Sequence, residues 1–414
     1  MSMHPIIAAL RKHKASAALM AAQIALSLAI VCNATFIISQ RVERISRPTG
    51  INESDLFLVT QQWVGAPSMD TPDGVDKLDT LLQEDLTALT RLADIASVAD
   101  ISTLPLLGST RTWGLTLKPD QQQGIDTVYY FGDDKMLSTL GLRLLSGRGF
   151  DKSDIRHQGD RDSRPPSIVI VTKALADRLF PGGAAVGKVV YLEGSSKPIT
   201  VVGVIERLQT SASDNWTKGY DWNATLIPAR LNTNFSRYAV RAKHGRLAAA
   251  MKAVPAALYA ANPMRVLDDR SVRGFADIRA EAYRSDVGMA ILMSIVCSIL
   301  LVVTAACIVG LSSLWVGQRY KQIGVRRALG ARKGDILRYF LAENLLITGG
   351  GAVNGGLLAV GLNLWLMSHY EMDRMPLRYV LIGIVTVLVL NQLAVFMPAR
   401  RASDIPPVVA ARMV

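Results

Sequence analysis

One segment has the spacing of a nucleotide-binding loop. Residues Gly182–Lys188 read GGAAVGK and fit G-x-x-x-x-G-K, a pattern in which backbone amides cradle phosphates and the lysine contacts them. A P-loop needs a Ser or Thr hydroxyl for magnesium at the next position, where this chain has Val189. It also lies between a strand and a helix, whereas here a helix is predicted before the segment and a strand after it. We therefore predict no nucleotide site, and no other P-loop pattern occurs in the 414 residues.

Residues that could act in catalysis or bind metals are scattered. The five histidines form no H-E-x-x-H motif, and no G-x-S-x-G motif marks a nucleophile. Cys32, Cys297 and Cys307 all fall in apolar segments, where small packing residues are the expected interpretation. We predict that this chain has no catalytic residue, no metal site and no bound cofactor.

The most informative segment is basic and lies between two apolar segments. Residues 319–336 read RYKQIGVRRALGARKGDI. They predict a short helix along a membrane surface, in which Ile323 and Leu329 pack while the arginines face lipid headgroups or a partner. Gly330 is predicted to end this helix, and Asp335 to cap the next one. A surface helix that merely obeys the positive-inside rule would explain the charges, but not the glycines and apolar positions together.

Four segments without Asp, Glu, Lys or Arg are long enough to cross a bilayer, which takes about 20 apolar residues. These segments are Ala15–Gln40, Val287–Gln318, Asn344–Ser368 and Tyr379–Ala399. The chain is 50 % hydrophobic, with a mean hydropathy of +0.25, which indicates membrane helices combined with a soluble domain. In the third segment, Gly351 and Gly355 have the G-x-x-x-G spacing that permits close helix approach, and we expect packing within the chain rather than a dimer seam.

The net charge of +12 is concentrated beside the apolar segments. Residues 41–286 hold 31 Lys and Arg against 29 Asp and Glu, whereas residues 1–14, 319–343 and 400–414 carry +3, +5 and +2. Four crossings place these three short segments on one side, which the positive-inside rule identifies as the cytoplasm. The excess charge therefore reflects membrane topology, and no nucleic-acid partner is predicted.

The residues after the first span alternate between strand-like and helix-like patterns, which predicts an external α+β domain. The predicted strands are 55–61, 113–117, 167–171, 189–192, 199–204 and 238–241, and the predicted helices are 78–96, 134–140, 172–179 and 246–261. Residues 154–166 are charged and end in two prolines, which predicts an exposed loop. Residues 270–286 are predicted to continue without a break into the second span as a helical stalk.

Lys321–Ala331, followed by Ile336 and Phe340–Glu343, resembles the signature of FtsX-like and MacB-like ABC permeases. The tail Pro398–Arg412 resembles the C-terminal signature of the same family. The resemblance implies a coupling helix that contacts an ATPase through Lys321, Gln322, Ile323, Gly324, Arg326, Arg327, Ala328, Leu329, Gly330 and Ala331. The family usually has Glu where this chain has Gln322, which weakens any inferred salt bridge at that position.

The external domain resembles the MacB-type periplasmic core domain over Asp134–Phe150, Ile168–Ile205 and Tyr238–Pro263. The expected organisation is membrane α-helical, with four transmembrane helices and an α+β extracytoplasmic domain between helices 1 and 2. Its parts are 1–46, an interfacial elbow helix and the first transmembrane helix; 47–269, the periplasmic core domain with two subdomains and an inner insertion at about 137–224; 270–318, the stalk and second transmembrane helix; 319–335, the coupling helix; 336–368, the third transmembrane helix; 369–378, a short periplasmic loop; 379–399, the fourth transmembrane helix; and 400–414, a cytoplasmic tail.

The resemblance implies a multi-pass permease subunit of the inner membrane, with both termini cytoplasmic and the large domain periplasmic. ATP hydrolysis by a separate ATPase dimer, which would hold the ATP and magnesium, is expected to move the periplasmic domain by mechanotransmission. The expected purpose is export or extraction of a substrate from the periplasm or inner membrane. The other expected partners are membrane lipid and a second permease chain, identical or paralogous.

The resemblance leaves three questions open. One is whether a periplasmic adaptor and an outer-membrane channel are required. Another is the substrate. The third is whether the same motion serves a non-transporting, FtsX-type regulator of a cell-envelope enzyme or signalling partner. A membrane-anchored enzyme is disfavoured, because no nucleophile, base or metal ligands are clustered.

Overall fold

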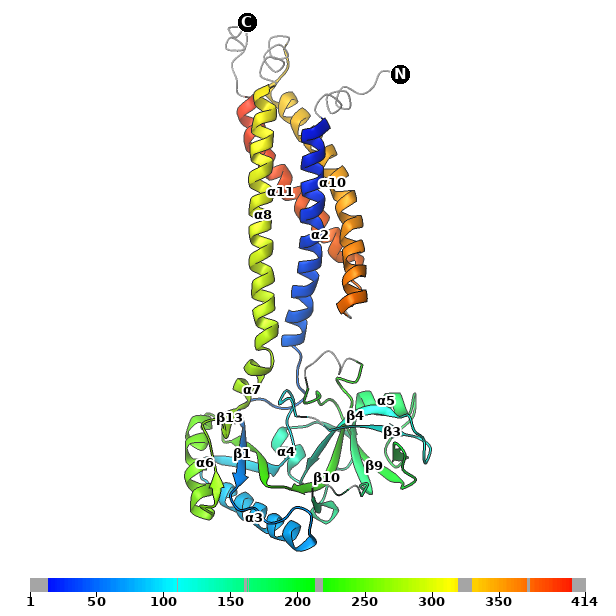
Figure 1. Cartoon of the computed structure of the whole chain (residues 1–414), viewed down its shortest axis with the longest axis vertical. Helices are drawn as coiled ribbons and strands as arrows, with labels where there is room; N and C mark the ends of the chain where they lie inside the picture. Colours follow the sequence, from blue (N-terminus) through cyan, green and yellow to red (C-terminus); the bar gives the residue numbers. More distant parts are fainter. Residues whose placement is uncertain are drawn as a thin grey trace. The chain divides into compact units, whose positions relative to one another are not determined.

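The chain forms two compact units that are interleaved along the sequence. The structure is a computed structural model that describes residues 14–109, 111–159, 162, 164–212, 219–318, 330–370 and 373–403. Met1–Ser46 and Ser285–Val414 form one unit, here called the helix bundle, and Arg47–Arg284 forms the other, here called the inserted domain. Figure 1 shows the long helices of the bundle and the sheets and helices of the inserted domain. The predicted elbow helix before Lys14 and the predicted tail after Ser403 lie outside the described residues.

Four long helices make up the described part of the bundle. They are α2 (Lys14–Ile45), α8 (Arg284–Gln318), α10 (Lys333–Tyr370) and α11 (Leu377–Ser403). Each is long and apolar enough to cross a membrane, which confirms the four predicted spans. The first of these helices continues to Ile45, and Pro48 and Gly50, which disfavour helix, follow soon after its end.

Helix α2 is the most enclosed of the four. Its side chains Ile24, Leu28 and Cys32 are buried in a cluster with Ala359 of α10 and Val387 of α11. Of the α2 span 56 % is buried, against 11 % of the α8 span. Helix α8 therefore leaves most of its apolar surface uncovered by the described residues of its own chain.

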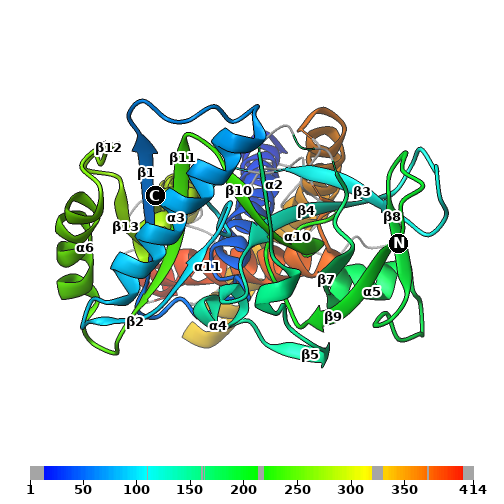
Figure 2. The ribbon, with the colours of Figure 1, turned by 90° about the horizontal axis from the view of Figure 1, so that it is seen from below.

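The first sheet of the inserted domain is antiparallel. Its strands run in the order β12 (Arg265–Val266), β1 (Leu56–Trp63), β11 (Phe235–Ala242) and β2 (Ile95–Asp100), and β13 (Val272–Gly274) also pairs with β1. Helices α3 (Pro72–Thr90) and α6 (Leu247–Ala261) pack on this sheet, and Figure 2 shows both beside its strands. Leu82 of α3 and Val254 of α6 are buried against Tyr238 and Val240 of β11. Apolar residues at helical spacing in both helices produce this core.

The second sheet is larger and partly closed. Its strands run in the order β4 (Ile125–Gly132), β3 (Thr112–Thr116), β8 (Val189–Leu192), β9 (Ile199–Ile205), β7 (Ile168–Thr172), β10 (Ala224–Asn232) and β6 (Arg156–Gly159), and β5 (Leu144–Gly147) pairs with β9. Strand β4 also pairs with β10, so the strands from β4 to β10 form a ring. Helix α5 (Lys173–Leu179) adds Leu175 and Leu179 to a core that contains Val171 and Val190. Two short helices, α4 (Met136–Leu140) and η1 (Lys152–Asp154), complete this region.

Several predicted elements are present with nearly the predicted ends. Strands β8 and β9, predicted at 189–192 and 199–204, form an antiparallel hairpin, with Val190 opposite Ile199. Helix α6 has Arg246 at its N-cap and ends before Asn262, as the following Pro263 indicates. The sequence patterns do not predict β10, because Pro228 interrupts it and proline is usually confined to strand edges and bulges. The strands of the second sheet lie between Thr112 and Asn232, a longer stretch than the expected inner insertion of about 137–224.

The predicted continuous stalk is wrong. Residues 270–286 do not form one helix, because β13 pairs with β1 and Gly274 then starts a separate helix, α7 (Phe275–Ala282). A break at Tyr283 separates α7 from α8. The cause is tertiary: Phe275, Ile278 and Tyr283 are buried in the inserted domain, so this segment packs there instead of projecting as a single rod.

Two further predictions need correction. The helix predicted at 78–96 instead runs from Pro72 to Thr90. It starts earlier than predicted because Thr71 accepts a hydrogen bond from the Gly74 amide at 3.3 Å and Pro72 occupies the first helical position. The loop predicted at 154–166 contains strand β6, which pairs in parallel with β10. Residues 160, 161 and 163 of that loop lie outside the described residues.

Candidate functional site

Most of the predicted coupling helix lies outside the described residues. This applies to Lys321, Gln322, Ile323, Gly324, Arg326, Arg327, Ala328 and Leu329. Gly330 and Ala331 are described, and Gly330 has a φ of 99°, a conformation that favours glycine. The carboxylate of Asp335, in the first turn of α10, accepts a hydrogen bond from the backbone amide of Arg332 at 3.1 Å. Asp335 thus satisfies an amide that would otherwise have no acceptor at this helix start.

The two predicted packing glycines lie where α10 meets α2. A Cβ atom at Gly351 would lie 2.9 Å from the Ala21 carbonyl oxygen, and one at Gly355 would lie 2.9 Å from the Ala25 carbonyl oxygen. Real Cβ atoms do not come this close to backbone, so the two helices approach as they do because these residues are glycines. Gly361, on the same helix, has no such neighbour within 4 Å.

Polar side chains inside the bundle make contacts between helices. Ser27 of α2 and Thr304 of α8 share a hydrogen bond of 2.8 Å, and the Asn33 amide donates to the Ala359 carbonyl of α10 at 3.0 Å. Gln392 of α11 donates to the Leu341 carbonyl of α10 at 3.4 Å. Asn354 instead donates to Gly350 within its own helix, because its side chain is exposed. Ser27, Asn33 and Gln392 therefore form hydrogen bonds between helices.

The chain enters and leaves the inserted domain through two segments that are joined by one arginine. We call residues 47–53 the incoming segment and residues 275–283 the outgoing segment. Arg279 donates from Nη1 to the Glu53 carboxylate and from Nη2 to the Arg47 carbonyl, each at 2.6 Å. The same guanidinium lies 5.6 Å from the centre of the Tyr283 ring. The two segments are thus held together within the domain.

Gln209 links both segments to the second sheet. Its backbone amide donates to the Thr49 carbonyl at 2.8 Å, and its side chain donates to the Tyr283 hydroxyl at 3.1 Å. Its own carbonyl accepts from the Tyr130 hydroxyl of β4 at 2.6 Å. Gln209 is 4 % exposed, so these bonds are shielded from water and constrain the three elements strongly.

The helix bundle has a similar connection at the ends of α2 and α8. Asp286, near the start of α8, pairs with Arg41 of α2, and Arg44 Nε lies 3.8 Å from the same carboxylate. The Asp286 side chain is only 6 % exposed, so the pair is better shielded than a surface ion pair. Sequence reasoning did not find this connection or the Arg279 connection, because each joins residues more than 220 positions apart.

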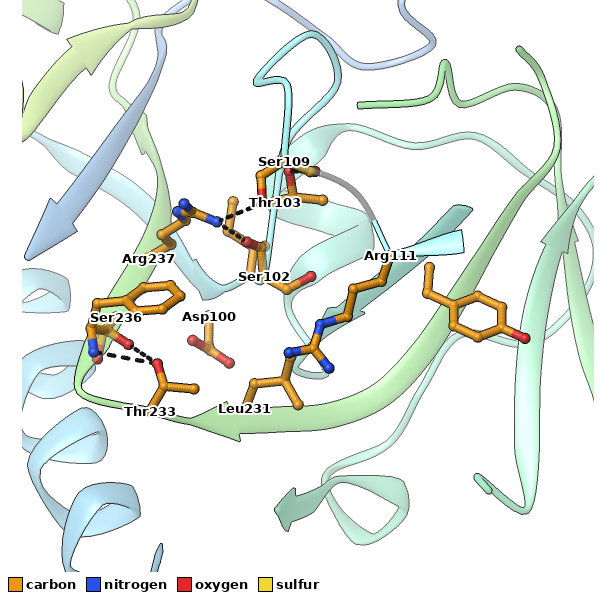
Figure 3. A pocket seen from close by; sticks show the side chains of 12 residues that line it. Asp100, Ser102, Thr103, Ser109, Arg111, Leu231, Thr233, Ser236 and Arg237 are labelled. Carbon is orange, nitrogen blue, oxygen red and sulfur yellow. Dashed lines mark hydrogen bonds between the residues drawn. The ribbon is translucent and has the colours of Figure 1, made fainter. Parts of the chain in front are cut away.

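A polar cavity of about 170 Å³ lies between the two sheets of the inserted domain. Figure 3 shows Arg111 and Arg237 extending toward it from different parts of the fold, with Asp100 also at its wall. Arg237 donates to the Ser102 carbonyl at 2.7 Å. No sequence motif pointed to this cavity, because its residues come from four separate segments.

The segment that resembles a P-loop is occupied by other contacts. It forms the turn between α5 and β8, the reverse of the expected strand–loop–helix order. The Gly187 amide donates to the Val201 carbonyl at 2.8 Å, and the Lys188 amide to the Ala185 carbonyl at 3.1 Å. These amides therefore are not directed at a phosphate.

Comparison with known proteins identifies two family regions. A family model described as MacB-like periplasmic core domain matches residues 18–257, and one described as FtsX-like permease C-terminal matches residues 294–407. The periplasmic region of MacB from Actinobacillus actinomycetemcomitans has 12 % sequence identity and a TM-score of 0.33, over 58 % of this chain and 97 % of that one.

Curated relatives carry the name "Macrolide export ATP-binding/permease protein MacB". The one from Chromobacterium violaceum is 27 % identical over 274 residues, which cover 65 % of this chain and 40 % of the relative. The one from Neisseria gonorrhoeae is 25 % identical over 344 residues, which cover 80 % of this chain and 49 % of the relative. The chain thus spans less than half the length of these relatives. Because the first family model covers more than half of its residues and the second covers most of its C-terminal part, the chain belongs to the MacB-like and FtsX-like ABC permease family.

Proposed function

We propose that this chain is the permease subunit of an ABC-type transporter in which ATP hydrolysis by a separate ATPase subunit moves the inserted domain. The proposed result is export, or extraction of a substrate from the periplasm or inner membrane. The relatives are named macrolide export proteins, so a macrolide is the first substrate to test.

One observation supports this proposal. The two stretches of chain that connect the helix bundle with the inserted domain are joined to each other within each unit. Asp286 with Arg41 joins the ends of α2 and α8 in the bundle, and Arg279 with Glu53 joins the two segments in the inserted domain. A displacement of either membrane helix would therefore be imposed on both ends of the domain together. Two such connections suit the transmission of motion from the membrane helices to the inserted domain. The ATP-driven transport cycle is part of the proposal.

We further propose that two permease chains associate. Helix α8 exposes apolar side chains on most of its length, including Ile295, Ile299 and Val302. Lipid can cover such a surface, but α8 is buried to a much smaller extent than the other three spans. A second permease chain would cover part of it, and the remainder would face lipid.

The proposed location is the inner membrane, with both termini in the cytoplasm. The positive charge at 319–343 supports this orientation. An impermeant maleimide applied to spheroplasts should label Ser196→Cys in the inserted domain but not Lys333→Cys at the start of α10. The opposite labelling pattern would overturn the topology and the coupling scheme.

The coupling role is tested by co-expressing this chain with a candidate ABC ATPase and purifying the two together. We expect the double variant Arg326→Ala and Arg327→Ala to lose the ATPase. The matched variant Arg400→Ala and Arg401→Ala, which removes two basic residues from the same proposed side, should retain it. Equal retention in both variants would show that the 319–331 segment does not bind the ATPase.

A further inference from the structure

Arg237 is a partly buried cation without a carboxylate partner among the described residues. Its Nη1 atom donates to the Ser102 carbonyl at 2.7 Å and lies 3.4 Å from the Ser109 hydroxyl. The guanidinium is also 5.0 Å from the centre of the Phe235 ring. Burial and the positive charge of Arg273 lower the pKa of Arg237, so its surroundings do not compensate its charge. Partly buried arginines are usually paired with an acid, which makes this position a candidate for an external anion.

Arg237 lines two cavities. The cavity of about 170 Å³ described above is one, and the other measures about 480 Å³. Arg237 and Phe235 line both. In the larger cavity, Arg273 pairs with Glu281 at 2.8 Å, so an acid of the chain already faces its positive charge. The smaller cavity is therefore the better candidate for binding an anion.

The charges of the smaller cavity favour a negatively charged ligand. Besides Arg237 it is lined by Arg111, a second guanidinium, and by Asp100. Asp100 is 4 % exposed, and burial together with the negative charge of Asp133 raises its pKa well above the usual value. A protonated carboxyl at this position can donate a hydrogen bond, while both guanidinium groups stay positive. The cavity thus offers two cations to a ligand, and burial of Asp100 disfavours a negative charge on its carboxyl.

We propose that this cavity binds a small organic carboxylate. A guanidinium presents parallel N–H groups that match a planar carboxylate, and the polar residues Thr103 and Ser236 line the same space. Ile101, Leu231 and Phe235 provide apolar surface for a hydrocarbon body. This mixture of charged and apolar lining suits an organic acid better than inorganic phosphate, which has no apolar part.

The position of the cavity gives the ligand a structural effect. Asp100 ends β2 and Arg237 lies on β11 of the first sheet, whereas Leu231 lies on β10 and Arg111 just before β3 of the second sheet. A bound carboxylate would therefore connect the two sheets. The proposal does not depend on the transport role, because it rests on the lining of this cavity alone.

Equilibrium dialysis of radiolabelled phenylacetate against the full chain in detergent tests the site, with empty micelles as the blank. We expect saturable binding that unlabelled succinate displaces and that 2-phenylethanol and inorganic phosphate do not. Arg237→Gln should weaken binding by about tenfold or more, because charge-assisted hydrogen bonds are lost. Arg246→Gln removes an exposed arginine that pairs with Asp94 outside the cavity and should bind as the unaltered chain does.

Arg111→Gln provides a second variant, at a side chain that is exposed rather than buried in the core. We expect it to weaken phenylacetate binding as well. The proposal is overturned if the unaltered chain shows no saturable binding, or if folded Arg237→Gln and Arg111→Gln both bind like Arg246→Gln. Displacement by phosphate would reject the carboxylate class, and displacement by 2-phenylethanol would show nonspecific apolar binding.

Discussion

Arg279 and Glu53 are 226 positions apart in the sequence, and their side chains meet at 2.6 Å. The contact joins the segment that leads the chain into the inserted domain with the segment that leads it out. Both side chains are partly buried, at 22 % and 33 % exposure, so water screens the pair less than a surface pair. Any relative movement of the two segments must stretch or break this contact.

Arg279 and Glu53 are therefore expected to be energetically coupled. A double-mutant cycle with Arg279→Gln and Glu53→Gln should give a coupling free energy of about 1–3 kcal/mol, measured by denaturant unfolding of the full chain. The control cycle uses Arg143 and Glu206, whose side chains are 75 % and 47 % exposed and should be coupled by at most about 1 kcal/mol. Additive effects in the first cycle would contradict the connection.

The buried pair of Asp85 and Arg265 should dominate the stability of the first sheet. Both side chains are fully buried, and Asp85 also accepts a hydrogen bond from the Tyr238 hydroxyl at 2.7 Å. Asp85→Ala leaves a buried, unpaired arginine and should cost about 3–5 kcal/mol of unfolding free energy. Asp73→Ala, in the same helix, removes an exposed pair with Lys77 and should cost no more than about 1 kcal/mol. Similar losses in both variants would refute this view.

Asp133 should make the inserted domain less stable as the pH rises from about 4 to about 6. Burial raises the pKa of Asp133 to about 6, whereas an unfolded aspartate titrates near 3.9. Between these values the folded chain keeps a proton that the unfolded chain releases, so the folded state loses stability with increasing pH. The total effect is on the order of 3 kcal/mol.

Asp133→Asn tests this pH dependence. The variant should flatten the unfolding free energy between pH 4 and pH 6, as measured by denaturant titrations at each pH. Asp134→Asn, at the adjacent position, is the control and should keep the slope of the unaltered chain. Asp100, whose pKa is raised still further by burial, should continue the same trend at higher pH. An unchanged slope in Asp133→Asn would show that another group titrates in this range.

Gly355 should be much less tolerant of substitution than Gly361 on the same helix. A side chain at Gly355 would collide with the Ala25 backbone of α2, whereas Gly361 has nothing within 4 Å of its Cβ position. Gly355→Leu should therefore separate α10 from α2 and lower the thermal midpoint of the detergent-purified chain. Gly361→Leu should be neutral or raise the midpoint, because leucine favours helix by up to about 1 kcal/mol over glycine. If both variants behaved alike, close packing at Gly355 would not be required.

Local sequence patterns were sufficient for the elements whose energetics are local. The four membrane spans follow from runs of uncharged residues, since each charged residue placed in lipid adds its own free-energy cost. The hairpin of β8 and β9 follows from two short apolar runs and the Gly194–Pro198 turn between them. The end of α6 at Asn262 follows from the proline after it.

Other features depend on contacts between distant residues. The helical pattern of residues 270–286 is genuine, but pairing of β13 with β1 and burial of Tyr283 outweigh the preference for one continuous helix. Strand β10 holds Pro228 and is assigned only by its neighbours β4, β6 and β7. In both cases a weak local preference yields to the larger free energy of tertiary packing.

The sequence alone determined the membrane helices, the α+β character of the large domain and the family motifs, because periodicity, uncharged length and signature residues are local properties. The tertiary structure decided that Arg279 meets Glu53, that Arg237 lines a cavity together with Arg111 and Asp100, and that the expected stalk is broken. Those outcomes arise from which side chains the folded chain buries together, and no spacing along the sequence encodes that choice.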